Sequence, residues 1–263
     1  MKKLISLLLA VVLIGCTFAA CGSNDATNSD SDLAYIKNKG TLVVGITEYA
    51  PMNYKEEGST EWTGFDTEYA QKVAEKLGVK AEFVVIDWDN KYTELDAKSI
   101  DCIWNGMTIT DEGKLNASIT DPYVHNAQVV VMAKDKLAQY PDAASMKDLK
   151  FAVENGSAGA EVAAEEGFEN VTPVLDQSTA LMEVSSGSAD ACIIDITMAN
   201  SMTGEGTSYA NYGYQVQLRE EEYGIACRKG SDLVAEINKI TDELMADGTM
   251  DQLAEKYQLT LIK

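Results

Sequence analysis

The sequence predicts an α/β protein in which two successive series of strands and helices form two lobes. In each series, short apolar runs alternate with stretches whose apolar residues recur at helical spacing. Strands that alternate with helices are typical of sheets that contain parallel strands. The length of 263 residues is above that of an average domain and allows one or two lobes with cores of their own.

The first series occupies the N-terminal half of the chain. Strands are expected at residues 42–45, 81–86, 101–104 and 128–132, and a helix at 90–97. A second helix, at residues 66–77, is the best marked, because Asp66 is a good N-cap and Gly78 supplies a C-terminal stop. The run 81–86 is apolar enough to predict a buried strand.

The second series and the C-terminal region repeat the pattern. Strands are expected at residues 151–153, 171–175, 191–194 and 223–227, and helices at 160–166 and 179–186. Ser231 is then predicted to cap a helix whose apolar face carries Leu233, Ile237, Ile240 and Leu244. Gly248 ends this helix, and Thr249 begins the last one.

Residues 1–21 have the pattern of a secretory signal of the lipoprotein type. Two lysines precede an apolar run at residues 4–14, which is too short to span a bilayer because a spanning helix takes about 20 residues. Small residues precede both candidate lipidated cysteines, and the polar stretch directly after Cys21 favours it over Cys16. Residues 22–32 are expected to form a flexible tether, since they contain no apolar side chain larger than Ala. We therefore expect a protein lipid-anchored to the cell membrane on its extracytoplasmic face.

Charge and metal-binding residue types exclude several functions. The formal net charge of −21 disfavours nucleic acid, whose binding needs clustered Lys and Arg. Cys102, Cys192 and Cys227 lie in apolar runs at wide spacing, which predicts buried free thiols. His125 is the only histidine, which excludes a metal site made of several histidines. No metal, cofactor or catalytic residue is expected.

Six short motifs are spread over residues 41–258. They are Gly64-Phe65-Asp66, Asp87-Trp88-Asp89, residues 100–110 (Ile-Asp-Cys-Ile-Trp-Asn-Gly-Met-Thr-Ile-Thr), Thr120-Asp121-Pro122-Tyr123, Ala189-Asp190-Ala191 and residues 245–249 (Met-Ala-Asp-Gly-Thr). Together they resemble the family 3 extracellular solute-binding proteins, the polar-amino-acid receptors of ABC transporters.

The resemblance implies a periplasmic-binding-protein-like fold of type II, with two α/β lobes, two strand crossings as the hinge and a ligand cleft between the lobes. The crossings are expected near Val130–Lys134 and Leu218–Gly224. Residues 33–131 and 221–263 would then form a discontinuous first lobe, and residues 132–220 the second. The implied function is the substrate-binding subunit of an ABC importer, a monomer that passes an amino acid or related amine to the membrane permease. The alternative is a dehydratase-type enzyme acting on a small cyclic carboxylic acid.

The resemblance also implies ligand contacts in the first lobe. Trp88 matches a lid position where an aromatic ring stacks on the ligand or its ammonium group, with a core tryptophan as the alternative. A loop offers backbone and hydroxyl groups to the ligand at Asn105, Gly106 and Thr108. Glu48 and Tyr49 match first-loop positions that touch the ligand's side chain, although Glu48 also fits a solvated loop.

In the second lobe, Ser157 and Ala158 precede a helix whose free N–H groups attract an anion. Asp195 matches the carboxylate that holds the ligand's ammonium group, with a helix cap as the alternative. The chain departs from the family where an Arg normally forks onto the α-carboxylate, because Gly113 and then Lys114 stand there. We therefore expect a preference for solutes whose acid group is absent, displaced or masked, and stronger α-amino-acid binding in Gly113→Arg if position 113 points into the cleft.

Overall fold

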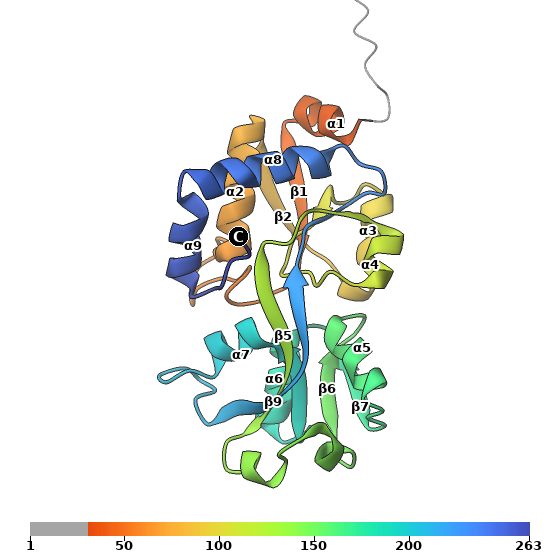
Figure 1. Cartoon of the computed structure of the whole chain (residues 1–263), viewed down its shortest axis with the longest axis vertical. Helices are drawn as coiled ribbons and strands as arrows, with labels where there is room; N and C mark the ends of the chain where they lie inside the picture. The colour runs from red at the N-terminus through yellow and green to blue at the C-terminus, as the bar shows by residue number, and fades with distance from the viewer. Residues whose placement is uncertain (1–30) are drawn as a thin grey trace, which may run out of the picture.

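The computed structural model describes residues 31–263, which form two lobes with a separate sheet in each (Figure 1). The predicted α/β class is therefore confirmed. The signal sequence, both candidate lipidated cysteines and nearly all of the tether lie outside the described residues. In the described part of the chain, no helix is both long enough and apolar enough to cross a bilayer.

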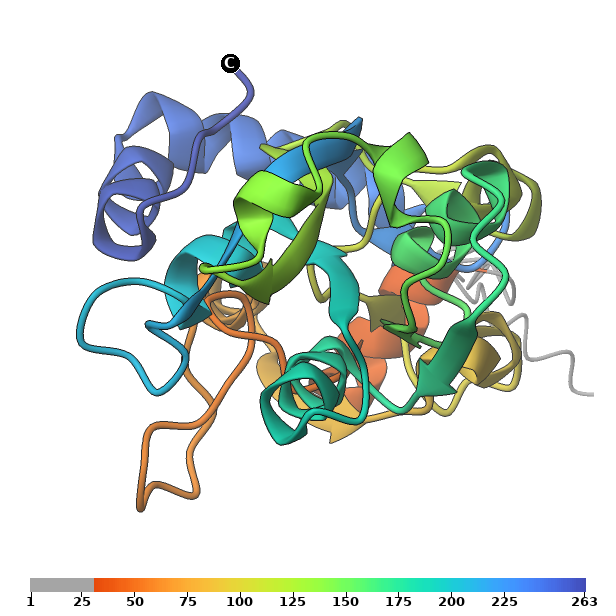
Figure 2. The same ribbon diagram turned by 90° about the horizontal axis from the view of Figure 1, so that it is seen from below.

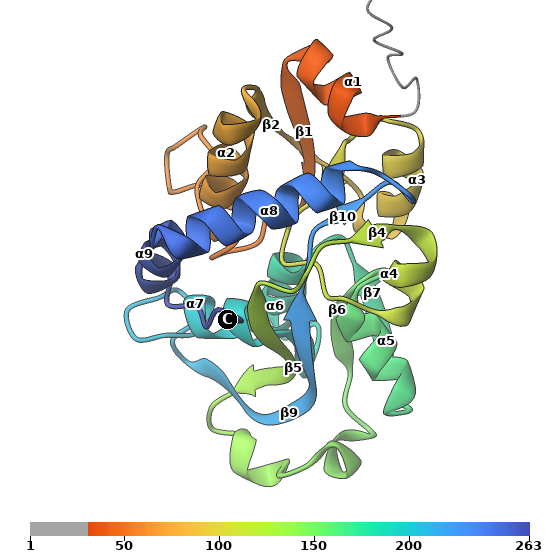
Figure 3. The same cartoon turned by 45° about the horizontal axis from the view of Figure 1, so that its top comes forward.

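The first lobe is built on a five-stranded sheet in the order β2-β1-β3-β10-β4. Its strands are β1 (Thr41–Ile46), β2 (Lys80–Val85), β3 (Cys102–Ile103), β4 (Ser118–Ile119) and β10 (Ala226–Cys227). Its helices are α1 (Asp32–Lys39), α2 (Phe65–Leu77), α3 (Lys91–Asp96), α4 (Asp111–Asn116), α8 (Leu233–Ala246) and α9 (Thr249–Tyr257), with the 3-10 turn η1 (Trp88–Asn90) before α3. Helix α8 runs across this lobe toward α9 (Figure 3).

The second lobe is built on a five-stranded sheet in the order β7-β6-β8-β5-β9. Its strands are β5 (Val124–Ala133), β6 (Phe151–Glu154), β7 (Val171–Val174), β8 (Ala191–Asp195) and β9 (Tyr212–Tyr223). Its helices are α5 (Ala158–Glu165), α6 (Gln177–Ser186) and α7 (Ile196–Met202), with 3-10 turns η2 (Leu137–Gln139) and η3 (Ala143–Met146). Seen from below, the loops at residues 55–61 and 203–211 project on the same side of the molecule (Figure 2).

The long strands β5 and β9 link the two lobes (Figure 1). They pair with each other from Val124 to Ala133, and β5 also pairs with β8 from Gln128 onward. The first crossing therefore runs through the start of β5, because Val124 still bridges to Leu261 of the first lobe and pairing with β8 begins only at Gln128. The location predicted for it, near residues 130–134, is wrong. Residues 130–133 are the end of β5, inside the second sheet, and Lys134 follows the strand. The second crossing runs through the end of β9, where Tyr223 bridges to Thr108 of the first lobe and the Glu222 carbonyl accepts the Ile109 N–H at 2.9 Å. It lies within the predicted range, residues 218–224.

The aromatic core of the first lobe positions the loop that reaches the cleft. Phe65 and Tyr123 stack with ring centroids 6.1 Å apart, and Trp104 meets Tyr69 edge to face at 4.6 Å. Asp66 is not the predicted N-cap of α2, because Gly64 holds that position. Its buried carboxylate instead accepts hydrogen bonds from the Gly106 N–H (2.6 Å) and the Tyr123 hydroxyl (2.9 Å).

The expectations for the cysteines, for the strand at residues 81–86 and for the end of the tether have different outcomes. Cys102, Cys192 and Cys227 are buried free thiols, as predicted. The run predicted as a buried strand is β2, an edge strand whose residues are exposed or only half-buried. The last residue of the expected tether, Asp32, begins α1, whose N-cap Ser31 accepts a hydrogen bond from the Ala34 N–H (3.0 Å).

Candidate ligand-binding cleft

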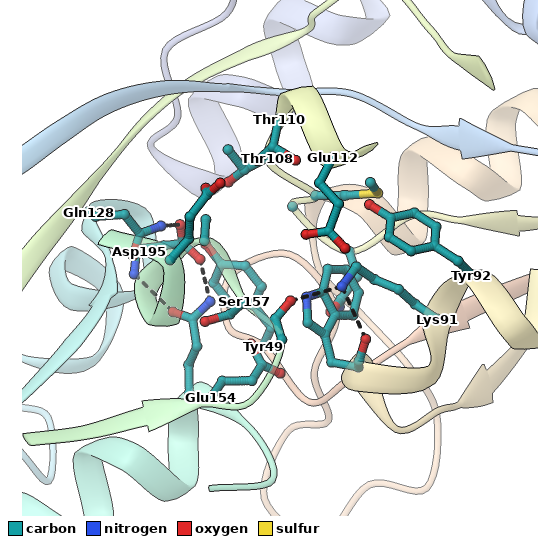
Figure 4. A pocket seen from close by; sticks show the side chains of 18 residues that line it. Tyr49, Lys91, Tyr92, Thr108, Thr110, Glu112, Gln128, Glu154, Ser157 and Asp195 are labelled. Atoms are coloured by element: carbon teal, nitrogen blue, oxygen red, sulfur yellow. Dashed lines mark hydrogen bonds between the residues drawn. The ribbon is translucent and has the colours of Figure 1, made fainter. Parts of the chain in front are cut away.

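A cavity lies between the lobes and is lined by both of them (Figure 4). Its wall includes eight of the nine predicted ligand residues, namely Tyr49, Trp88, Asn105, Gly106, Thr108, Ser157, Ala158 and Asp195. Glu48 is the exception, because it is exposed and does not line the cavity. Its backbone carbonyl accepts a hydrogen bond from the Ser178 hydroxyl of the other lobe at 3.3 Å. Residues far apart in the sequence thus meet at one place.

Asp195 lies at the junction of β8 and α7 with its carboxylate buried. Three amide groups donate to it, those of Asn126, Gln128 (2.7 Å) and Gln177, and its own N–H donates to the Gln177 carbonyl oxygen at 2.9 Å. Asp195 occupies the N-cap position of α7, as the helix-cap alternative expected, but its side chain makes no cap bond to the helix. Burial, and after it the neighbouring Glu221 carboxylate, raise the pKa of Asp195 to about 7.

Glu221 on β9 was not predicted as part of the site. Its carboxylate accepts hydrogen bonds from the Thr108 hydroxyl (2.8 Å), from the Gln128 amide (2.9 Å) and from Arg219 Nε (2.9 Å). The Thr108 hydroxyl is therefore already engaged within the protein.

Asn105 and Gly106 shape the first-lobe wall through contacts within the protein. The Asn105 amide bonds to Thr47 three times, at 2.8 to 3.0 Å, and joins the cleft loop to the end of β1. Gly106 has φ of +55°, and a Cβ there would stand 2.7 Å from the Tyr49 ring. Because its N–H is donated to Asp66, it is not free for a ligand.

The Tyr49 hydroxyl joins the lobes at the edge of the cavity. It lies 2.5 Å from the Thr197 hydroxyl on α7 and 2.5 Å from the Tyr223 hydroxyl at the end of β9. Burial raises the pKa of Tyr49 well above its ordinary value, and the charge of Asp195 adds to this, so the hydroxyl stays protonated. This network connects the first-lobe loop to the hinge.

Trp88 is buried in the core of the first lobe and also lines the cavity. Its contact with a ligand stays a prediction. The ammonium group near its ring belongs to the protein itself, since Lys91 Nζ lies 5.1 Å from the ring centroid and 4.9 Å from that of Tyr92. Lys91 also donates to the Trp88 carbonyl (3.2 Å) and to the Gly156 carbonyl in the other lobe (2.8 Å). Burial lowers the pKa of Lys91.

Gly113 does not face the cavity. A Cβ at this position would lie 3.2 Å from Ile119 Cδ1, 3.2 Å from the Tyr92 hydroxyl and 3.4 Å from Met107. Lys114 is exposed and does not line the cavity. The condition set for Gly113→Arg is therefore not met, because Gly113 does not line the cavity and a side chain leaving position 113 would meet Ile119, the Tyr92 hydroxyl and Met107.

In the second lobe, Ser157 caps α5 by accepting the Ala160 N–H at 3.2 Å. Gly156 before it has φ of +67°, and a Cβ there would stand 2.7 Å from Asp89 of the first lobe. The turn therefore needs glycine both for its conformation and for the close approach of the lobes. Ser157 and Ala158 line the cavity from the start of the helix.

Two α/β lobes that enclose a polar cavity across a two-strand hinge define a two-lobed binding protein of type II. Residues 42–260 match the family described as bacterial extracellular solute-binding proteins, family 3. The chain belongs to this family.

Three similar proteins show the range of the family. The L-cystine-binding protein TcyA of Bacillus subtilis (strain 168) is 31% identical over 269 residues, which cover 98% of this chain and 97% of TcyA. An ABC uptake transporter substrate-binding protein from Streptococcus pneumoniae, solved with bound histidine, has 28% identity and a TM-score of 0.78 over 87% of this chain and 96% of its own. The ancestral amino acid-binding protein AncCDT-1, described as a precursor of cyclohexadienyl dehydratase, has 32% identity and a TM-score of 0.78 over 86% of this chain and 99% of its own.

Proposed function

We propose that this protein captures an amino acid or a related amine between its lobes and delivers it to an ABC permease in the membrane. The observation that carries the proposal is the carboxylate of Asp195, which is buried in the cleft and fixed by three amide donors. No Lys or Arg of residues 31–263 forms an ion pair with it. A buried carboxylate without a cationic partner is costly, and a ligand ammonium group would supply the missing charge.

Binding by closure of the lobes follows from the same geometry. Bonds between the lobes run from Lys91 to the Gly156 carbonyl and from Tyr49 to Thr197, at either side of the cavity. A ligand that contacts both walls stabilises the closed arrangement over an open one. We also propose that the protein is a monomer, that it acts without chemistry of its own, and that lipid on Cys21, or alternatively Cys16, holds it at the extracytoplasmic face of the membrane.

The proposal is tested by calorimetric titration of the purified protein with the common amino acids, cystine and small amines, followed by mass spectrometry of the recovered ligand. We expect at least one of these solutes to bind at micromolar concentration or tighter and to be recovered unchanged. Asp195→Asn should weaken that binding by about 2 to 5 kcal/mol, because the cationic group of the ligand would be buried in the cleft without the carboxylate that pairs with it.

Asp135→Asn is the matched control, since Asp135 is an exposed aspartate of the second lobe and should leave the affinity unchanged. Failure of every amino acid and amine to bind would contradict the proposal. Conversion of the ligand would favour the enzyme alternative.

A further inference from the structure

The ionisable side chains that line the cleft are mostly acidic (Figure 4). The cavity wall carries four carboxylates and one ammonium group, from Glu112, Glu154, Glu161, Asp195 and Lys91. The ammonium group is directed to two backbone carbonyls and forms no ion pair among the described residues. Glu161 is paired with Arg219 at 2.8 Å, which leaves the carboxylates of Glu112, Glu154 and Asp195 against the one ammonium group. A zwitterionic amino acid brings one positive and one negative charge, so it leaves this excess of carboxylates in place.

Glu154 is a cavity carboxylate with a buried oxygen that lacks a hydrogen-bond partner among the described residues. It ends β6 with only 3% of its surface exposed, and it lines the same cavity as Asp195 and Lys91. Its Oε1 atom has no hydrogen-bond partner in the described part of the chain. A buried polar atom without a partner costs free energy, and a donor on the ligand would remove that cost.

We propose that Glu154 is a second cation-binding carboxylate of this site and that the ligand carries two cationic nitrogen groups, one bound by Asp195 and the other by Glu154. This proposal rests on the proposed function and narrows its substrate class. The two residues end neighbouring parallel strands, β6 and β8, so their side chains reach the cavity from the same edge of the sheet. A second cationic nitrogen gives the Oε1 atom its missing donor and balances the acidic wall.

The groups around Glu154 predict how its pKa differs from that of a free glutamate and what happens to its proton when a cation binds. Burial, followed by the charges of Asp195 and Asp176, raises the pKa of Glu154 well above its ordinary value, whereas the Lys91 ammonium lowers it. The carboxyl in the empty cleft therefore keeps its proton to a higher pH than a free glutamate does. A bound cation favours the ionised form, so binding releases a proton, and the affinity for a doubly cationic solute rises with pH.

The test compares solutes that differ in one cationic group. The pairs are L-lysine with L-norleucine, L-arginine with L-citrulline, and L-cystine with mono-N-acetyl-L-cystine, each titrated calorimetrically in buffers of different ionisation enthalpy. In at least one pair we expect the wild type to prefer the doubly cationic member by roughly tenfold to hundredfold and to release more protons on binding it than on binding the singly cationic member, since Asp195 releases protons with either. Glu154→Gln should remove this preference, while Glu169→Gln, an exposed second-lobe glutamate, should keep it.

Two outcomes overturn the inference. One is equal or reversed affinity within every pair that binds, and the other is an unchanged preference in Glu154→Gln. In either case the proposed function stands if any amino acid binds in a manner that depends on Asp195, whereas failure of all amino acids and amines to bind removes both proposals. If thermal melting shows that Glu154→Gln folds poorly, the wild type still decides the matter through its preference and through the difference in proton release between the two members of a pair.

Discussion

Asp66 links the stability of the first lobe to pH. Burial raises its pKa to about 7 from the ordinary value of 3.8, so the folded protein holds this proton more tightly than the unfolded chain does. The stabilisation is fully present below pH 3.8 and is lost as the pH rises through about 7. Asp195 acts in the same direction, because its pKa is also raised to about 7.

We therefore predict that the free energy of unfolding decreases from about pH 5 to about pH 8, since the folded state must give up protons that the unfolded chain has already lost. In Asp66→Asn the decrease should be smaller, and part of it should persist because of Asp195. Urea unfolding of both proteins at the two pH values measures this. An identical decrease in the variant would show that Asp66 does not carry the effect.

The resemblance to the family predicted part of the site. It pointed to Asp195 and Trp88, whereas Lys91, Glu154 and Glu221 were not predicted. Charged residues are mostly exposed in proteins, so nothing local indicates that these three are buried. Their burial arises from contacts between segments far apart in the chain, such as the bond of Lys91 to the Gly156 carbonyl.

At the scale of elements, the sequence predicted short apolar strands better than long mixed ones. The run at residues 151–153 corresponds to β6, while β9 extends over twelve residues of which only its last few were expected near a crossing. Strand β9 pairs with β5 by hydrogen bonds between main chains, which do not depend on an apolar pattern. The position of the hinge therefore became visible only with the pairing of these two strands.

Tyr49 connects the first-lobe loop to the end of β9 and to α7, so its hydroxyl should favour the closed arrangement. We predict that Tyr49→Phe weakens ligand binding by about 1 to 2 kcal/mol, because the bonds to Thr197 and Tyr223 form fully only when the lobes are together. Calorimetry with the tightest-binding solute measures the change. Tyr69→Phe is the control, since its hydroxyl bonds to Thr241 within the first lobe. Equal losses of affinity in both variants would argue against a role of Tyr49 in closure.

For the whole molecule, two series of alternating strands and helices were enough to predict two α/β lobes. Alternation does not specify which sheet receives a late strand, and β10, near the C-terminus, inserts between β3 and β4 of the first sheet. This return of the chain makes the first lobe discontinuous. The arrangement allows the lobes to move about β5 and β9 while each sheet remains intact.

The central claim is that the cleft between the lobes binds an ammonium-bearing solute through Asp195. A crystal structure of the protein with the tightest-binding amino acid or amine tests it most directly. We predict a ligand enclosed by both lobes, with a cationic nitrogen within hydrogen-bonding distance, about 2.7 to 3.2 Å, of the Asp195 carboxylate. A ligand bound elsewhere on the molecule, or one in the cleft whose cationic nitrogen does not contact Asp195, would contradict this claim.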